Sequence, residues 1–71
     1  MEYVIVKCNE PREVFIDQQS NGLTDQSIRV SPGVHTFTLG GENNVTPPSI
    51  SILVTGTSPV KPLVITFEVQ S

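Results

Sequence analysis

The chain has 71 residues and a formal net charge of −3, and its composition excludes a helical fold. It contains 10 Val, 6 Ile and 7 Thr, whereas Ala is absent. β-Branched side chains lose rotamer freedom in a helix but pack well on a pleated sheet, and Ala is the strongest helix former. We therefore expect an all-β domain with little or no helix.

Length, charge and cysteine content limit the classes of function. Residues 1–71 make one domain with a small core, and a chain whose only cysteine is Cys8 forms no intramolecular disulfide. The four basic residues are scattered along the chain, so we expect no nucleic acid as a partner. No apolar run approaches the length of a membrane span, so we expect no membrane insertion. If Met1 is the native start, we expect a cytoplasmic protein; if the chain is an excised domain, we expect a cell-surface location.

Alternation of apolar and polar residues, interrupted by Gly, Pro, Asn and Asp, predicts six strands along the chain. They cover residues 2–8, 13–17, 27–30, 34–39, 49–55 and 63–69. Between the second and third strands, Asn21-Gly22 is the strongest turn signal, because both residues tolerate positive φ. The spacing is typical of a small antiparallel β-sandwich of six to seven short strands.

One short pattern occurs twice. Residues 23–30 and 45–52 share the sequence apolar-Thr-x-x-Ser-Ile-x-apolar. Two copies are too few for a solenoid, which needs at least about three repeats to bury a continuous core. Two interpretations stay open: one way of leading a loop into a strand that is used twice, or chance similarity in a chain rich in Thr, Ser and Ile.

A central part of the chain, residues 13–40, combines three short motifs. They are Val14-Phe15-Ile16-Asp17, then Gly22-Leu23-Thr24, then the stretch from Ile28 to Leu39 with its Ser31-Pro32-Gly33 turn and following His35. In this succession of motifs the segment resembles the PEGA domain. The resemblance implies a short all-β module that serves in interaction or structure within bacterial or archaeal proteins. It implies no catalytic residues.

Two further patterns are candidates for chemical sites. Residues 17–22 resemble the first half of a calcium loop, but Ile28 stands where the bidentate Glu belongs, so we expect a solvated turn in which Asp17 accepts backbone N–H groups. His35 is the only histidine, and one His with one Cys does not supply the three or four ligands of zinc. We expect it to make a structural hydrogen bond at the rim of the sandwich. We predict no catalytic residues, no bound metal and no cofactor.

The most informative feature is a set of apolar residues that alternation places on the face opposite the expected core. They are Tyr3, Ile5, Phe15, Leu53 and Val64. Five such residues on outer faces are enough for a patch of a few hundred square ångströms. The hypothesis is that this candidate interaction surface mediates self-association or binds a partner. The alternative is that loops cover these residues, or that the facing assignment is wrong in the first strand.

These observations favour a non-enzymatic protein-interaction or structural module. Its partner would be a protein or a second copy, bound through an outer apolar face or at an unpaired sheet edge. The alternative function is a carbohydrate-binding module of a surface protein. Such modules usually present aromatic rings to sugars, and this chain has no Trp.

Overall fold

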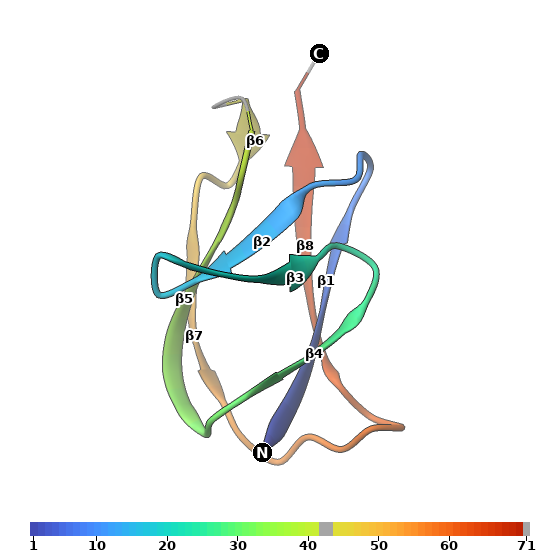
Figure 1. Cartoon of the computed structure of the whole chain (residues 1–71), viewed down its shortest axis with the longest axis vertical. Helices are drawn as coiled ribbons and strands as arrows, with labels where there is room; N and C mark the ends of the chain where they lie inside the picture. Colours follow the sequence, from blue (N-terminus) through green and yellow to red (C-terminus); the bar gives the residue numbers. More distant parts are fainter. Residues whose placement is uncertain (42–43, 71) are drawn as a thin grey trace.

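The computed structural model of the chain describes residues 1–41 and 44–70 and confirms the all-β fold class (Figure 1). The described residues form eight strands and no helix. The strands are β1 (Glu2–Cys8), β2 (Glu13–Ile16), β3 (Gln19–Leu23), β4 (Ser27–Val30), β5 (Gly33–Leu39), β6 (Val45–Thr46), β7 (Ile50–Val54) and β8 (Leu63–Val69).

Two four-stranded sheets pack face to face. The first sheet has the order β4-β1-β8-β6 and the second has the order β3-β2-β5-β7. The core lies between them, because alternate residues on both sheets point inward. Its buried members are Val4, Val6, Val14, Ile16, Ile28, Val30, Phe37, Val54, Ile65 and Phe67.

The sequence predicts a purely antiparallel sandwich, but one pair of strands differs: β1 and β8 are parallel. The reason lies in the segment that precedes β8, which returns the chain to the end of the sandwich at which β1 begins. There the Glu2 carboxylate accepts hydrogen bonds from the backbone N–H of Thr57, at 2.9 Å, and from its hydroxyl, at 2.7 Å. From that end β8 runs in the same direction as β1 (Figure 1).

The strand count exceeds the expected six to seven because β3 and β6 are present. The expected turn at Asn21-Gly22 is wrong: the chain turns at Asp17 and Gln18, whose φ angles of 52° and 70° suit a two-residue hairpin turn. Gly22 lies within β3 beside a β-bulge and has a φ of 132°. Its conformational freedom therefore serves the bulge and not the turn.

The two copies of the repeated pattern occupy equivalent places in the sandwich. Residues 23–30 lead from β3 in the second sheet to β4 in the first, and residues 45–52 lead from β6 in the first sheet to β7 in the second. All four of these strands lie at sheet edges. The pattern therefore occurs at both connections between edge strands of opposite sheets, which supports the interpretation as one way of leading a loop into a strand that is used twice.

Neighbouring residues of β8 test which face is buried. Ile65 is 3% exposed and Val64 is 54% exposed. We expect Ile65→Val to lower the free energy of unfolding by about 0.5–1.5 kcal/mol, because a buried methylene is lost, and Val64→Ala to leave it nearly unchanged. Urea unfolding followed by circular dichroism measures both. Equal losses in the two variants would contradict the facing assignment.

Candidate functional site

The five residues of the candidate interaction surface fall on two different faces. Tyr3 and Ile5 of β1 and Val64 of β8 lie on the outer face of the first sheet, where Ile5 is directly opposite Val64. Phe15 of β2 and Leu53 of β7 lie on the outer face of the second sheet. The structure therefore brings three of them together and separates the other two from that group.

On the second sheet the exposed apolar residues form a pair. Leu53 is 58% exposed and is directly opposite Val34 of β5, which is 68% exposed. The register of β5 and β7 is what brings Val34 beside Leu53. We call these two residues the β7-side pair.

Phe15 does not belong to the β7-side pair. The next position along the sheet is polar, because the hydroxyl groups of Thr36 and Ser51 lie 2.9 Å apart in a hydrogen bond. Phe15 is half-buried and packs over Gly40, where an added Cβ would lie 2.9 Å from the ring. The close approach of the ring to this backbone requires glycine there.

The free edge of β7 is the least protected of the four sheet edges among the described residues. β3 contains a bulge and a glycine, β4 carries the charged Arg29, and β6 has two residues. β7 has five residues, Ile50–Val54, with no charge, proline, glycine or bulge. Native proteins blunt edges with those devices, so an edge that lacks them is a template for another strand.

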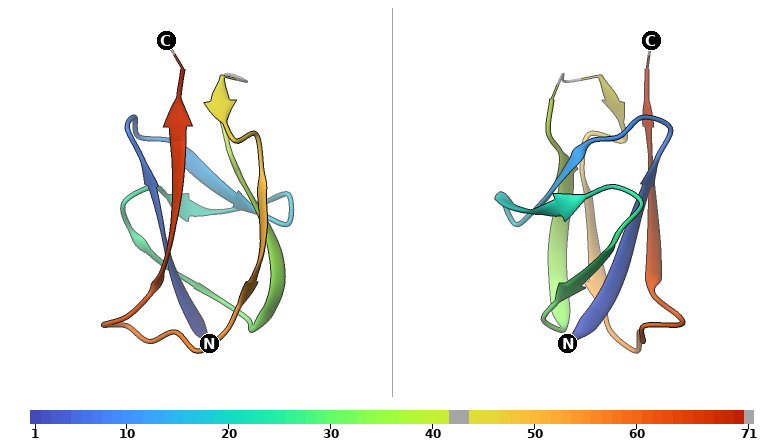
Figure 2. Two further views of the ribbon diagram at one scale, coloured as in Figure 1. Left: turned by 180° about the vertical axis from the view of Figure 1, so that it is seen from behind. Right: turned by 45° about the vertical axis from the view of Figure 1, so that its right-hand side comes forward.

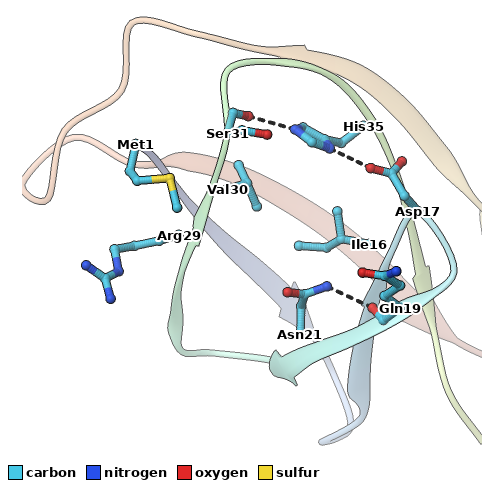
Figure 3. Close-up of a pocket in the computed structure, with 9 residues that line it drawn as sticks. All are labelled: Met1, Ile16, Asp17, Gln19, Asn21, Arg29, Val30, Ser31 and His35. Carbon is cyan, nitrogen blue, oxygen red and sulfur yellow. Dashed lines mark hydrogen bonds and ion pairs between the residues drawn. The ribbon is translucent and has the colours of Figure 1, made fainter.

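A pocket of about 300 Å³ opens on the opposite long side, between β3 and β4 (Figure 3). Its lining comprises Met1, Ile16, Asp17, Gln19, Asn21, Arg29, Val30, Ser31 and His35. Most of these side chains are polar, and His35 is the only one with an aromatic ring.

His35 is held at the rim of this pocket by two hydrogen bonds of 2.7 Å. Nδ1 contacts Oδ2 of Asp17, and Nε2 contacts the backbone carbonyl oxygen of Ser31 (Figure 3). A carbonyl oxygen and an ionised carboxylate only accept, so both contacts are complete hydrogen bonds only when both ring nitrogens carry a proton, as in the imidazolium. These bonds raise the pKa of His35, with Asp17 as the larger cause and Ser31 as the smaller.

Asp17 is positioned by the backbone of Thr36 in β5. Its Oδ1 accepts the backbone N–H of Thr36 at 3.0 Å, and this bond is the main reason that the pKa of Asp17 is lowered, followed by His35. The expected roles of both residues are thereby confirmed: Asp17 accepts a backbone N–H, and His35 makes structural hydrogen bonds at the rim. Ser31 contributes its carbonyl and not its hydroxyl, so the cluster contains no nucleophile aligned with a base.

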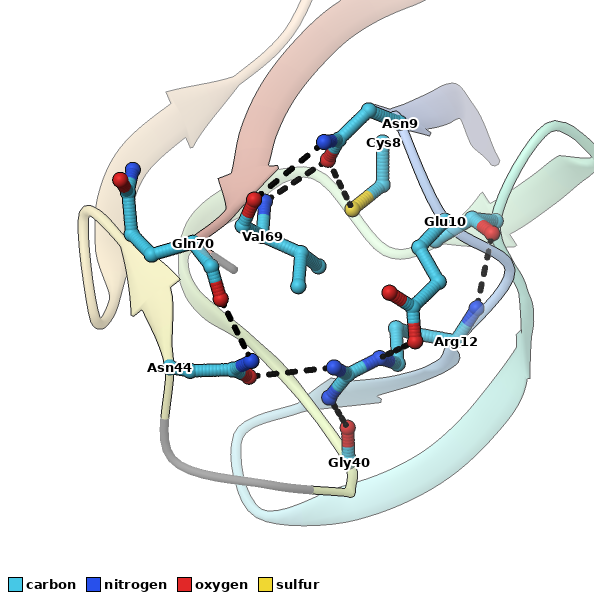
Figure 4. A network of polar contacts seen from close by, with 9 residues as sticks. Cys8, Asn9, Glu10, Arg12, Gly40, Asn44, Val69 and Gln70 are labelled. Atoms are coloured by element: carbon cyan, nitrogen blue, oxygen red, sulfur yellow. Dashed lines mark hydrogen bonds and ion pairs between the residues drawn. The ribbon is translucent and has the colours of Figure 1, made fainter.

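A second polar network closes the far end of the sandwich around Arg12 (Figure 4). The Arg12 side chain is 9% exposed and donates to the carbonyl oxygen of Gly40 at 2.9 Å and to Oδ1 of Asn44 at 3.1 Å. Asn44 donates in turn to the carbonyl oxygen of Gln70 at 2.8 Å. The network joins the loops after β1 and β5 to the chain beyond β8, and Cys8 lies half-buried beside it.

Within residues 1–41 and 44–70 there is no cluster of three or more side chains suited to hold a metal ion. Over the same residues no helix is long and apolar enough to cross a membrane. Comparison of the chain with protein-family models, with curated proteins and with solved structures found no match. The resemblance to the PEGA domain therefore stays a prediction.

The contact between His35 and Asp17 predicts a pH dependence of stability. Because folding raises the pKa of His35, its contribution is fully present below the unfolded value of 6.5 and is lost as the pH rises through the folded value. We expect the urea concentration at the unfolding midpoint of the wild type to decrease as the pH is raised from about 6 to about 9. The midpoint of His35→Gln should change less over this range.

Cys8→Ser is the control, because Cys8 is half-buried beside Asn9 and makes no contact with the His35 cluster. It is expected to keep the pH dependence of the wild type. Parallel curves for the wild type and His35→Gln would show that the cluster does not stabilise the fold.

Proposed function

We propose that the chain is a non-enzymatic protein-interaction module that binds an extended segment of a protein partner at the free edge of β7. The observation that carries the proposal is the edge itself, which has five residues and none of the usual protecting features. Its unpaired backbone groups offer a ladder of hydrogen bonds to an added strand. Affinity would come from this ladder, and selectivity from side chains at alternate positions.

The neighbouring side chains define the chemistry of the segment. On the outer face a partner residue would lie beside Leu53, which is already paired with Val34. On the inner face it would lie beside Ile52, which is half-buried against the core. A charge at either position would lose water without an opposite charge to meet, so the segment is uncharged over the paired residues and apolar beside Leu53.

A second uncovered edge lies on the same side but is less suited to a partner strand. β6 pairs only with Glu68 and Val69, which leaves the earlier part of β8 open. In the left view of Figure 2, β7 (orange) and β8 (red) both run along the long axis of the molecule, and β6 (yellow) lies near the upper end of β8. A strand added to β8 would meet β6 after Phe67, whereas the edge of β7 has no such stop in its sheet.

The other candidate activities have less support. Both nitrogens of His35 are engaged in hydrogen bonds, so neither is free to act as a base. Its described lining contains no Tyr, Trp or Phe ring for a sugar to stack on. We therefore place neither catalysis nor carbohydrate binding in the pocket.

A library of random peptides displayed on phage tests the proposed function. We expect selection on the immobilised chain to enrich uncharged peptides that form extended strands and carry β-branched residues at alternate positions. A selected peptide should shift the amide NMR signals of β7 and β5 and not those of β1. Leu53→Lys should weaken its binding about tenfold or more, because a lysine at an edge blocks an apolar partner.

Val64→Lys is the matched control, since Val64 and Leu53 are similarly exposed apolar residues on opposite outer faces. It should leave peptide binding unchanged. Selection of no such peptides, or equal loss of binding in the two lysine variants, would refute strand addition at β7.

A further inference from the structure

We infer that the strand bound at β7 is β7 of a second copy of this chain, so that the two second sheets join into one sheet of eight strands. The inference rests on the proposed function, because it names the occupant of the same edge. An edge-to-edge contact of this kind is isologous: one surface meets its own copy across a two-fold axis.

The chain itself contains a segment with the required chemistry. The partner strand must be extended, uncharged over about five residues and apolar beside Leu53. β7 has all three properties, since Ile50–Val54 is a regular strand with no charged side chain. Among the described residues, β8 also contains a long apolar stretch, but it has β1 on one side and β6 on the other, and it includes the charged Glu68.

The exposed side chains select one register. A two-fold axis perpendicular to the sheet keeps each residue on its own face. One residue of β7 then lies at the axis opposite its own copy, and every other residue faces one that is an even number of positions away in the sequence. If Leu53 lies opposite Leu53 of the second copy, each β7-side pair adjoins the other, and four apolar side chains form one row across four strands. Placing Ile52 at the axis would instead set Leu53 beside Ser51.

The same register also suits the inner face. Residues one step from the axis would be Ile52 of one copy and Val54 of the other. Ile52 is half-buried in the single chain and Val54 is fully buried. The added strand would therefore extend the core over the side on which Ile52 is now incompletely covered.

The acidic residues of the second sheet do not oppose this contact, although each copy carries a net charge of −3. Glu13 belongs to β2 and Asp17 to the turn that follows it, and β2 is separated from β7 by β5. With strands about 4.8 Å apart, β2 lies about 10 Å from β7, which exceeds the Debye length of about 8 Å at physiological ionic strength. The row at the axis is free of charge.

The size of the contact sets the expected strength. In this register Ile52, Leu53 and Val54 of one β7 face the same three residues of the other. So short a contact buries less than the approximately 1,200 Å² of a stable interface. We therefore expect a reversible dimer that forms as concentration rises.

Sedimentation velocity over a concentration series from micromolar to millimolar tests the inference. The wild type is expected to shift from monomer to dimer. Leu53→Lys and Leu53→Glu should each weaken association about tenfold or more, because like charges then lie directly opposite at the axis. An equimolar mixture of the two variants should associate again, because the charges opposite each other are then of opposite sign.

Val64→Lys is again the control and should dimerise like the wild type. A wild type that stays monomeric at millimolar concentration, or a mixture that fails to associate more strongly than either variant alone, would overturn the second-copy inference. If displayed peptides still bind β7 in that case, the proposed function stands without it. If neither a peptide nor a second copy binds β7, both fail.

Discussion

The parallel pairing of β1 with β8 is the constraint on which the rest of the structure depends. These two strands form the centre of the first sheet, and each contributes two fully or nearly fully buried side chains to the core. Val4 and Val6 of β1 and Ile65 and Phe67 of β8 cannot be covered until the first and last strands of the chain pair. Closing so long a loop has an entropic cost, but one that grows only slowly with length.

Side-chain hydrogen bonds close both ends of this central pair in a chain that has no disulfide to do so. At one end Glu2 binds Thr57. At the other the Asn9 side chain bonds both the N–H and the carbonyl oxygen of Val69, 60 residues away. Each bond gives a partner to a backbone or side-chain group at a strand end, where the ladder of the sheet supplies none. The Arg12 network connects the neighbouring loops to the same end of the pair.

The positions of most strands can be predicted from the sequence, because a strand with one buried face has an apolar residue at every second position. The strands β1, β4 and β8 agree with expectation, and the inward positions of β2, β5 and β7 do as well. β3 escaped detection because all five of its residues are exposed and nothing in its sequence alternates. Its turn was misplaced because Asp17-Gln18 lacks the usual Asn-Gly signal and is instead stabilised by the bond from Thr36.

The pairing of strands was less accessible than their existence. Alternation says which residues share a face of one strand but not which strand lies beside it. The division of the candidate interaction surface between two sheets, the contact of Val34 with Leu53 and the contact of Asp17 with His35 all depend on register. The sequence singles out Asp17 and His35 separately, and only the fold brings Oδ2 of Asp17 to 2.7 Å from Nδ1 of His35.

The direction of β1 and β8 has a mechanical consequence. Because they run in parallel, the start of β1 and the end of β8 lie at opposite ends of the sandwich (Figure 1). Tension applied between those points acts along the strands and loads the five paired positions from Val4–Leu63 to Cys8–Phe67 at the same time. A hairpin pulled from its open end breaks one pair after another, whereas this arrangement must shear all of them together. The central pair is thus built to resist stretching in the direction in which the chain passes through the domain.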